Sequence, residues 1–528
     1  MKHKEQSTLN LPMRYMRFIL IGTVLALLPA ALWAQAVKLT APPAPDRGVF
    51  GFSVDIEGDY AVVGAPFDDI DKGAVYVFFK DPVRGWTQQA RLTNNDRIIG
   101  DAFGISVDLD GSFLLIGAPG GGDEGGHDAG AAYVFFNDPV RGWTQQARLT
   151  ARDPASEDRY GYVVALSGIF ALVAAPFDDD DGHDSGAVYV YAFNGSGRWQ
   201  YQDKLTAPSA DADDNFGKAL ALDDETALIG APNADEPRGR NAGLAYVFAR
   251  SAGSSWIVRA VLTAGDAATA NHFGTAIAVG VDPMTGLPQA VIGAPNARGR
   301  SIGSAYVFTE QDMLWTQVQQ LIPDEADSGD NIGSAVALHG AYALIGAPDA
   351  EAGVLNTDVG AAYLFVNDPG IGWHQRATLT SPDAVQNACF ACAVAFDDGH
   401  FIVGAWGEDG TVPNVGAAYV FDRSTIFTRF EDPPELPSSL IAPINYPNPF
   451  RHTTTIAFEV PEKSAGHQPA RLAIYDILGR EVAVLVNHPL RPGRHEIAWT
   501  AAGLPSGVYA YQVTIGDQTQ TRRMLRVR

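Results

Sequence analysis

Closely spaced aspartates are the residues of this 528-residue sequence whose type and spacing could do chemistry. The densest group is Asp178–Asp181 with Asp184, and similar acidic segments recur along the chain. Carboxylate oxygens at this density are the ligands that Ca²⁺ prefers in proteins. We therefore predict a Ca²⁺ site formed by Asp178, Asp180 and Asp184. The alternative is that these segments are solvated acidic loops.

Two histidine–aspartate pairs stand in matched contexts, Gly126-His127-Asp128 and Gly182-His183-Asp184. Such a pair can bind a metal or act in acid–base catalysis. Recurrence at the same position of a repeat would hold the two pairs apart instead of bringing them together. We therefore interpret them as a repeated turn motif.

The two cysteines, Cys389 and Cys392, are three residues apart. They either form a local disulfide, which requires a turn at Cys389, or remain reduced as small buried residues. A redox pair of this spacing usually opens a helix, and no helix is predicted here.

Sequence motifs of catalysis are absent. The chain has no Gly-x-Ser-x-Gly elbow, no phosphate-binding glycine loop and no histidine-rich metal motif. Carboxylate pairs are too abundant for any one of them to indicate a glycosidase. We predict no catalytic residues and no enzyme activity.

A sevenfold repeat positions these residues. The tripeptide Gly-Ala-Pro, or a close variant, recurs with its third residue at 66, 119, 176, 232, 295, 348 and 406. Each unit has four short apolar runs in a fixed order, starting after an aromatic-Gly pair and ending in Leu-Thr. Turn residues separate the runs, which predicts four antiparallel strands per unit. Both faces of each sheet are apolar, so the prediction is an all-β fold with a seven-bladed β-propeller.

Closure of the ring gives an independent check. The seventh unit lacks its Trp…Leu-Thr strand, and the segment from Trp33 to Thr40 resembles that strand in the first unit. The N-terminal strand is therefore predicted to complete the last blade, shortened to about 35–40 by cleavage of the leader. In a four-stranded blade, the loops between strands two and three open on the same face as the connections between blades. We expect the acidic segments to crowd that face.

The units resemble FG-GAP repeats, the propeller blades of integrin α-subunits and of many bacterial exported proteins. The resemblance covers about 37–425 and rests on seven ordered Phe-Gly…Gly-Ala-Pro copies. It implies the fold but not an activity. Integrin-type Ca²⁺ loops lie between strands one and two, and here those turns are short, as at 108–111.

The N-terminal segment, 1–36, is predicted to be a signal peptide. Basic residues precede an apolar run, and small residues lead to Ala34-Gln35-Ala36, so cleavage is expected after Ala34 or Ala36. Cleavage leaves no transmembrane anchor in the mature chain. A retained anchor is the alternative, but the apolar run is at the short limit for spanning a bilayer.

The rest of the chain divides into a propeller at 37–429, an acidic Pro-rich linker at 430–442 and a tail at 443–528. Six strand-like runs predict a small C-terminal β-sandwich. The tail resembles the C-terminal sorting domain of the type IX secretion route, on residues such as Tyr446–Phe450 and Thr521–Met524. This resemblance implies recognition by outer-membrane secretion machinery and a secreted or surface-attached protein.

Charge and fold together limit the function. Residues 37–442 hold 23 basic and 54 acidic residues, a net charge of −31, which excludes nucleic acid as a partner. We predict a binding or adhesion module for an extracellular protein or glycan ligand on the acidic loop face. The alternatives are an extracellular polysaccharide lyase or hydrolase built on the propeller, and a structural surface-layer component that self-associates without a pocket.

Overall fold

The computed structural model describes residues 36–41, 48–427 and 444–526. The second range has gaps at 97, 122–125, 196, 252–254, 298–301, 352–358, 384–385 and 409–414, and the third at 447–449, 451–452, 461–468, 477–479, 492, 502–503, 506 and 517. Residues 1–35 of the predicted signal peptide and the whole predicted linker at 430–442 lie outside the described residues.

Six four-stranded antiparallel sheets are each continuous in sequence. Blade 1 contains β2 (Val54–Glu57), β3 (Tyr60–Ala65), β4 (Ala74–Asp81) and β5 (Gly85–Leu92), and blade 2 contains β6 (Val107–Asp110), β7 (Phe113–Ala118), β8 (Ala131–Asp138) and β9 (Gly142–Leu149). Blade 3 contains β10 (Val164–Ser167), β11 (Phe170–Ala175), β12 (Ala187–Phe193) and β13 (Trp199–Leu205). Blade 4 contains β14 (Ala219–Asp223), β15 (Thr226–Ala231), β16 (Leu244–Arg250) and β17 (Trp256–Leu262). Blade 5 contains β18 (Ala276–Val281), β19 (Pro288–Ala294), β20 (Ser304–Gln311) and β21 (Leu314–Leu321), and blade 6 contains β22 (Ala335–His339), β23 (Tyr342–Ala347), β24 (Ala361–Asp368) and β25 (Gly372–Leu379).

The seventh blade joins the two ends of the ring. It contains β26 (Phe390–Phe396), β27 (His400–Ala405) and β28 (Ala417–Asp422), and its outer strand is β1 (Val37–Leu39) from the N-terminus. β1 pairs antiparallel with β28, with Val37 opposite Val420 and Leu39 opposite Ala418. The predicted closure by the N-terminal strand is therefore confirmed.

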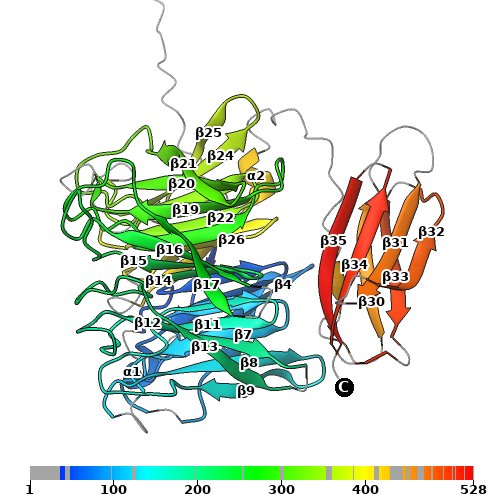
Figure 1. Cartoon of the computed structure of the whole chain (residues 1–528), viewed down its shortest axis with the longest axis horizontal. Coiled ribbons are helices and arrows are strands. Elements are labelled where there is room, and N and C mark those ends of the chain that lie inside the picture. The colour runs from blue at the N-terminus through cyan, green and yellow to red at the C-terminus, as the bar shows by residue number, and fades with distance from the viewer. Residues whose placement is uncertain are drawn as a thin grey trace, which may run out of the picture.

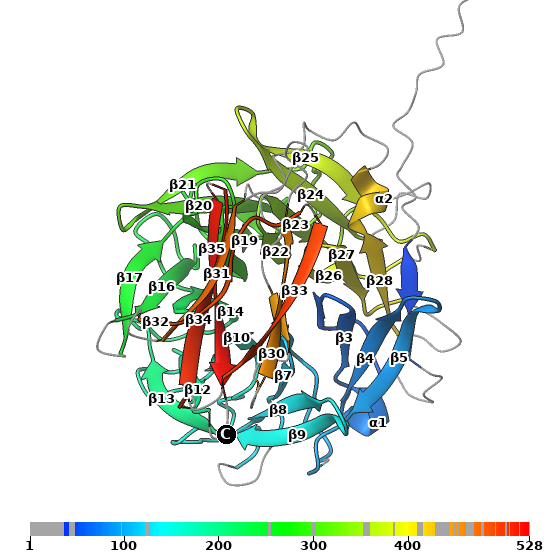
Figure 2. The same cartoon turned by 90° about the vertical axis from the view of Figure 1, so that its right-hand side faces the viewer.

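The blades stand around a common axis (Figure 2). The innermost strand of each blade contacts that of the next, from β2 through β6, β10, β14, β18 and β22 to β26, which contacts β2 again. The predicted seven-bladed β-propeller is confirmed. Two short turns interrupt the pattern, α1 (Asp68–Asp71) in blade 1 and α2 (Arg423–Phe427) after blade 7.

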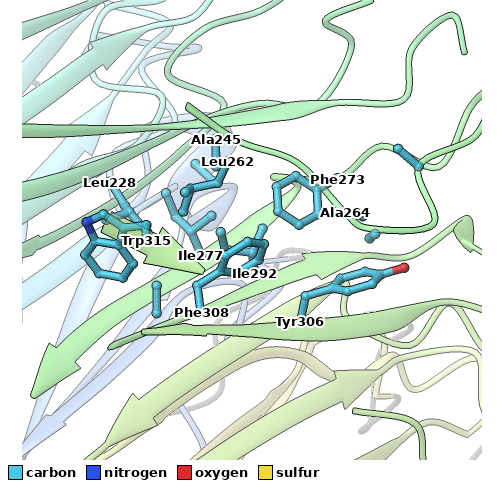
Figure 3. Close-up of a cluster of buried hydrophobic side chains, with 14 of the residues drawn as sticks. Leu228, Ala245, Leu262, Ala264, Phe273, Ile277, Ile292, Tyr306, Phe308 and Trp315 are labelled. Carbon is cyan, nitrogen blue, oxygen red and sulfur yellow. The ribbon is translucent and has the colours of Figure 1, made fainter. Parts of the chain in front are cut away.

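The hydrophobic core lies between adjacent blades. Figure 3 shows one such cluster, in which Leu228 of blade 4 and Ile292 of blade 5 are fully buried. The aromatic residue of each Phe-Gly pair packs edge-on against the tyrosine of the third strand, as Phe273 does on Tyr306, with 5.6 Å between ring centroids. Burial of each blade therefore depends on its neighbour.

Glycine follows the aromatic residue because two blades meet there. Gly161 has a φ of +91°, and a Cβ at this position would lie 2.2 Å from the carbonyl oxygen of Ala131 in the preceding blade. Only glycine accepts both the positive φ and the contact.

The C-terminal domain is a β-sandwich, as predicted. One sheet contains β29 (Ile444–Tyr446), β30 (Thr453–Val460) and β33 (Gly493–Thr500), and the other contains β31 (Ala470–Asp476), β32 (Glu481–Asn487), β34 (Gly507–Ile515) and β35 (Gln518–Arg526). Its core includes Ile456 from the first sheet and Leu472 and Val513 from the second. Figure 1 shows this domain beside the propeller. No helix among the described residues is long and apolar enough to cross a membrane.

Candidate functional site

The loop face is the end of the propeller that carries the loops between second and third strands and the connections between blades. Hydrogen bonds join the two kinds of segment: the amide of Asp213 donates to the carbonyl of His183 at 2.7 Å, and the amide of Asn215 donates to that of Asp184 at 3.0 Å. The acidic segments therefore share one face, as the repeat predicted.

The structure does not bring Asp178, Asp180 and Asp184 together as one ligand set. Asp178 is buried and lies 2.9 Å from the ammonium group of Lys204, which also lies 2.5 Å from Asp180. Asp184 lies instead with Asp179 and His183, whose potential ligand atoms are within 4.8 Å of one another. Asp178 and Asp180 thus share one lysine as their ion-pair partner, and Ca²⁺ binding stays a prediction.

The two histidine–aspartate pairs are exposed turns on neighbouring blades. Nδ1 of His127 lies 3.3 Å from Asp128, and Nδ1 of His183 lies 3.2 Å from Asp213. The hydrogen bond to Asp213 raises the pKa of His183. His127 thus interacts with the aspartate of its own turn, and His183 with an aspartate of the connection to the next blade. The two pairs lie on separate blades and do not converge, as the repeat predicted.

A buried tyrosine links the acidic loops to the blades, and sequence analysis missed this contact. The hydroxyl of Tyr76 donates to Asp68 at 2.7 Å, and Arg91 donates to the same carboxylate at 2.8 Å. The same arrangement recurs in blade 3, where the hydroxyl of Tyr189 donates to Asp178 at 3.0 Å. The available signal was the basic residue that directly precedes the Leu of Leu-Thr, as Arg91 does.

Blade 7 repeats this arrangement with a residue of the N-terminal strand. Lys38 of β1 forms ion pairs with Asp383, at 2.5 Å, and with the buried Glu408. The hydroxyl of Tyr419 hydrogen-bonds to both carboxylates. Burial raises the pKa of Glu408 despite the ion pair with Lys38. Ring closure therefore includes a buried charge contact as well as three paired residues.

Cys389 and Cys392 form a disulfide, with their Cα atoms 5.6 Å apart. Cys389 has the positive φ of 54° that the turn requires, and the amide of Cys392 donates to its carbonyl at 3.2 Å.

The innermost strands surround an axial cavity of about 450 Å³. Each inner strand starts at the loop face, so Phe52, Thr275 and Ser334 line the loop-face end, and Asp55 and Asp108 lie further along the axis. Among the residues that line this cavity, Lys218 is the one with a cationic side chain.

The carboxyls of Asp55 and Asp108 lie within hydrogen-bonding reach of each other in this cavity. Burial raises the pKa of Asp55 to about 6, and burial and the charge of Asp55 raise the pKa of Asp108. Asp55 accepts from the amide of Leu109 at 2.7 Å, and Asp108 accepts from that of Leu166 at 2.8 Å. The pair therefore connects blades 1, 2 and 3, and each carboxyl already accepts a hydrogen bond from a backbone amide of the next blade.

Fold and motifs define a class, the seven-bladed β-propeller joined to a C-terminal sorting domain. The chain belongs to the FG-GAP repeat family, whose model matches it seven times, over 33–78, 86–135, 143–191, 199–248, 256–308, 315–365 and 373–421. The secretion system C-terminal sorting domain matches 445–527. This tail marks the chain for secretion by the type IX route and for attachment at the cell surface.

Relatives and solved structures are distant. Integrin alpha-PS3 of Drosophila melanogaster is 28% identical in an alignment 237 residues long, with coverage of 37% of this chain and 20% of that relative. The chain thus covers about a fifth of that relative's length. PorZ, a surface component of the type IX secretion system of Porphyromonas gingivalis, is 13% identical with a TM-score of 0.26, covering 91% of this chain and 81% of PorZ. A Trypanosoma rangeli sialidase mutant is 11% identical with a TM-score of 0.33, covering 94% of each chain. Likeness at this level implies no shared activity.

Proposed function

We propose that this chain is a surface-displayed binding module whose propeller holds an extracellular ligand at the loop face. One observation carries the proposal: the contacts of tyrosine, carboxylate and basic residue beneath the loop face recur in blades 1, 3 and 7, whereas the residues on that face change around the ring. The residue after Gly-Ala-Pro, for example, is phenylalanine in blades 1 and 3, glycine in blade 2, asparagine in blades 4 and 5 and aspartate in blade 6. A repeated scaffold with a variable face is typical of repeat proteins that bind partners.

The position of the sorting domain supports the same proposal. Arg522 of β35 is close enough to two propeller aspartates to affect their pKa values. Burial raises the pKa of Asp223, and the positive charge of Arg522 partly opposes that rise. A hydrogen bond from His339 lowers the pKa of Asp398, and the charge of Arg522 lowers it further. Both aspartates lie at the turns between first and second strands, which we call the turn face. The sandwich stands at this end of the propeller in both views (Figures 1 and 2). The loop face therefore points away from the domain that directs attachment.

Site-specific blocking tests the proposal. The full chain carrying Asp181→Cys, an exposed position on the loop face, is coupled to a bulky maleimide-polyethylene glycol. The matched control is Val140→Cys, at the opposite end of blade 2, where the side chain is 91% exposed. The native cysteines are bonded to each other and do not react.

Binding is measured to a panel of extracellular matrix proteins and polysaccharides. We expect a ligand whose binding is lost with the loop-face adduct and kept with the control adduct. Equal binding by both adducts would place the ligand elsewhere. Turnover of a bound polysaccharide would favour the enzyme alternative, and self-association without any ligand would favour the surface-layer alternative. Each of these three results would contradict the proposal.

A further inference from the structure

Two positions of the repeat lie side by side near the loop-face end of the axial cavity: the residue after the aromatic-Gly pair and the residue after Gly-Ala-Pro. The first of these positions lines the cavity in five blades, as Phe52, Ile105, Lys218, Thr275 and Ser334. The two positions are neighbours because the glycine amide of the first segment donates to the glycine-position carbonyl of the second, as Gly51 does to Gly64 at 3.0 Å. In blade 1 these residues are Phe52 and Phe67, with 6.4 Å between ring centroids. We call this pair of positions around the ring the mouth.

The mouth is apolar along blades 7, 1, 2 and 3. Phe52 contacts Phe67 within its own blade, with 6.4 Å between ring centroids. At the same distance it contacts Trp406, which takes the proline position of Gly-Ala-Pro in blade 7 and so lies beside the mouth. Blade 3 contributes Tyr162 and Phe177, with 5.8 Å between their rings. Phe67 is 38% exposed, and the other four side chains are partly exposed. Of these side chains, Phe52 lines the axial cavity, and Phe67 adds an exposed aromatic ring beside it.

The mouth is polar along blades 4, 5 and 6. Thr275 and Ser334 line the cavity, and their hydroxyls donate to the carbonyls of His272 and Asn331, each at 2.7 Å. The oxygens of both hydroxyls can therefore still accept hydrogen bonds from a ligand. The side-chain amide of Asn233 is held at both ends: its Nδ2 donates to Oδ1 of Asn215 at 2.6 Å, and its Oδ1 lies 3.0 Å from Nδ1 of His272. These contacts pre-orient polar groups without burying them.

A cation stands at one boundary of the two halves. The ammonium group of Lys218 lies 4.1 Å from the centre of the Tyr162 ring and 4.7 Å from that of Phe177. It lines the cavity and holds the two rings in place.

We propose that the mouth binds a neutral glycan, with one sugar ring stacked on the aromatic half and its hydroxyls on the polar half. This inference rests on the proposed binding function and names the ligand class. A pyranose has an apolar C–H face and a hydroxyl edge, which match the two halves of the mouth. The cavity of about 450 Å³ has room for a sugar ring. The net charge of −31 over 37–442 disfavours polyanionic glycans.

Calorimetry of the full chain with neutral gluco-, manno-, galacto- and xylo-oligosaccharides tests the proposal. We expect Phe67→Ala and Asn233→Ala each to weaken the binding of one of these series at least tenfold. The control is Ile70→Ala, 61% exposed on the same face but outside the mouth, which should leave the affinity unchanged. Sugar binding should change the tryptophan fluorescence of the protein, and Trp406→Phe should remove the part of that change that comes from Trp406. Thermal midpoints within 2 °C of the wild type, on the order of 1 kcal/mol, would exclude misfolding as the cause.

The outcomes separate this inference from the proposed function. Sugar binding that Phe67→Ala and Asn233→Ala leave unchanged would overturn the glycan site. Loop-face binding of a protein or of an anionic polysaccharide, with no neutral sugar bound, would also overturn it while the binding function stands. Failure of the loop-face adduct to block any ligand would instead overturn the binding function.

Discussion

Ile70 is held in a backbone conformation that its side chain disfavours. Its φ and ψ are 59° and 60°, inside α1, and its side chain is 61% exposed. A left-handed conformation costs an L-residue roughly 1–2 kcal/mol, and asparagine tolerates it better than a β-branched residue. We expect Ile70→Asn to raise the thermal midpoint by about 1–2 °C. The control is Ile99→Asn, which is 65% exposed and has no positive φ, and an equal rise there would contradict the explanation.

At the residue scale the structure also shows partners that the sequence did not predict. Asp178 and Asp180 looked like cation ligands because the sequence shows them beside other aspartates. Their partner, Lys204, is more than 20 residues away on the outermost strand, and only the folded blade brings it to 2.9 and 2.5 Å. Likewise, the contact between Asp55 and Asp108 depends on two adjacent blades, so no local pattern predicts it.

At the scale of strands and turns, glycines at blade contacts should be far less replaceable than glycines in open turns. Gly161 combines a φ of +91° with a Cβ position 2.2 Å from a carbonyl oxygen. Gly168 has a φ of +57°, and a Cβ at this position would lie 4.0 Å from its nearest neighbour, a carboxylate oxygen of Asp224. We expect Gly168→Ala to cost about 1 kcal/mol and Gly161→Ala about 3 kcal/mol or more, measured by urea unfolding. Equal losses would show that φ alone, and not the contact between blades, selects glycine.

The closing strand should depend on Lys38 in a way that other blades do not depend on their lysines. Lys38→Met leaves Asp383 and the buried Glu408 without their cation, at a cost of about 2 kcal/mol. β1 pairs with only three residues of β28, so we expect it to detach and Leu39 to lose hydrogen-exchange protection. The control, Lys204→Met, removes the same kind of contact within a continuous blade and should leave β1 protected. Retained protection in Lys38→Met would contradict this role.

The strands were predictable because their signals are local and repeated seven times. Apolar runs, glycine turns and the incomplete last unit were enough for the blades and for the closure by β1. What the sequence did not predict depends on the ring: the halves of the mouth are visible only once blades 7, 1, 2 and 3 are known to be contiguous. The β29 strand, with three residues, is too short to show a periodic pattern.

The loop face and the axis of the propeller have different charge environments. On the loop face, carboxylates meet Lys38, Arg91 and Lys204. Along the axis, Asp55, Asp108 and Asp110 have raised pKa values, in each case first because of burial. Asp110 accepts from the amide of Gly168, so these carboxyls also join blade 2 to blade 3. Folding therefore favours the protonated forms of these acids more than the unfolded chain does.

This arrangement predicts the pH dependence of the propeller's stability. The pKa of Asp55 is raised to about 6 in the folded protein, from an unfolded value near 3.8, and that of Asp108 is also raised. The stability these groups contribute is fully present below the unfolded pKa and is lost as the pH rises through the folded values. Asp108→Asn keeps a donor for Asp55 and an acceptor for Leu166 without the charge. We expect it to raise the thermal midpoint at pH 8.5 by several degrees, with little change at pH 4. Asp181→Asn, at an exposed carboxylate, is the control and should change neither midpoint. A gain for Asp108→Asn that is as large at pH 4 as at pH 8.5 would mean that the side chain's shape, and not its ionisation, limits the stability of the ring.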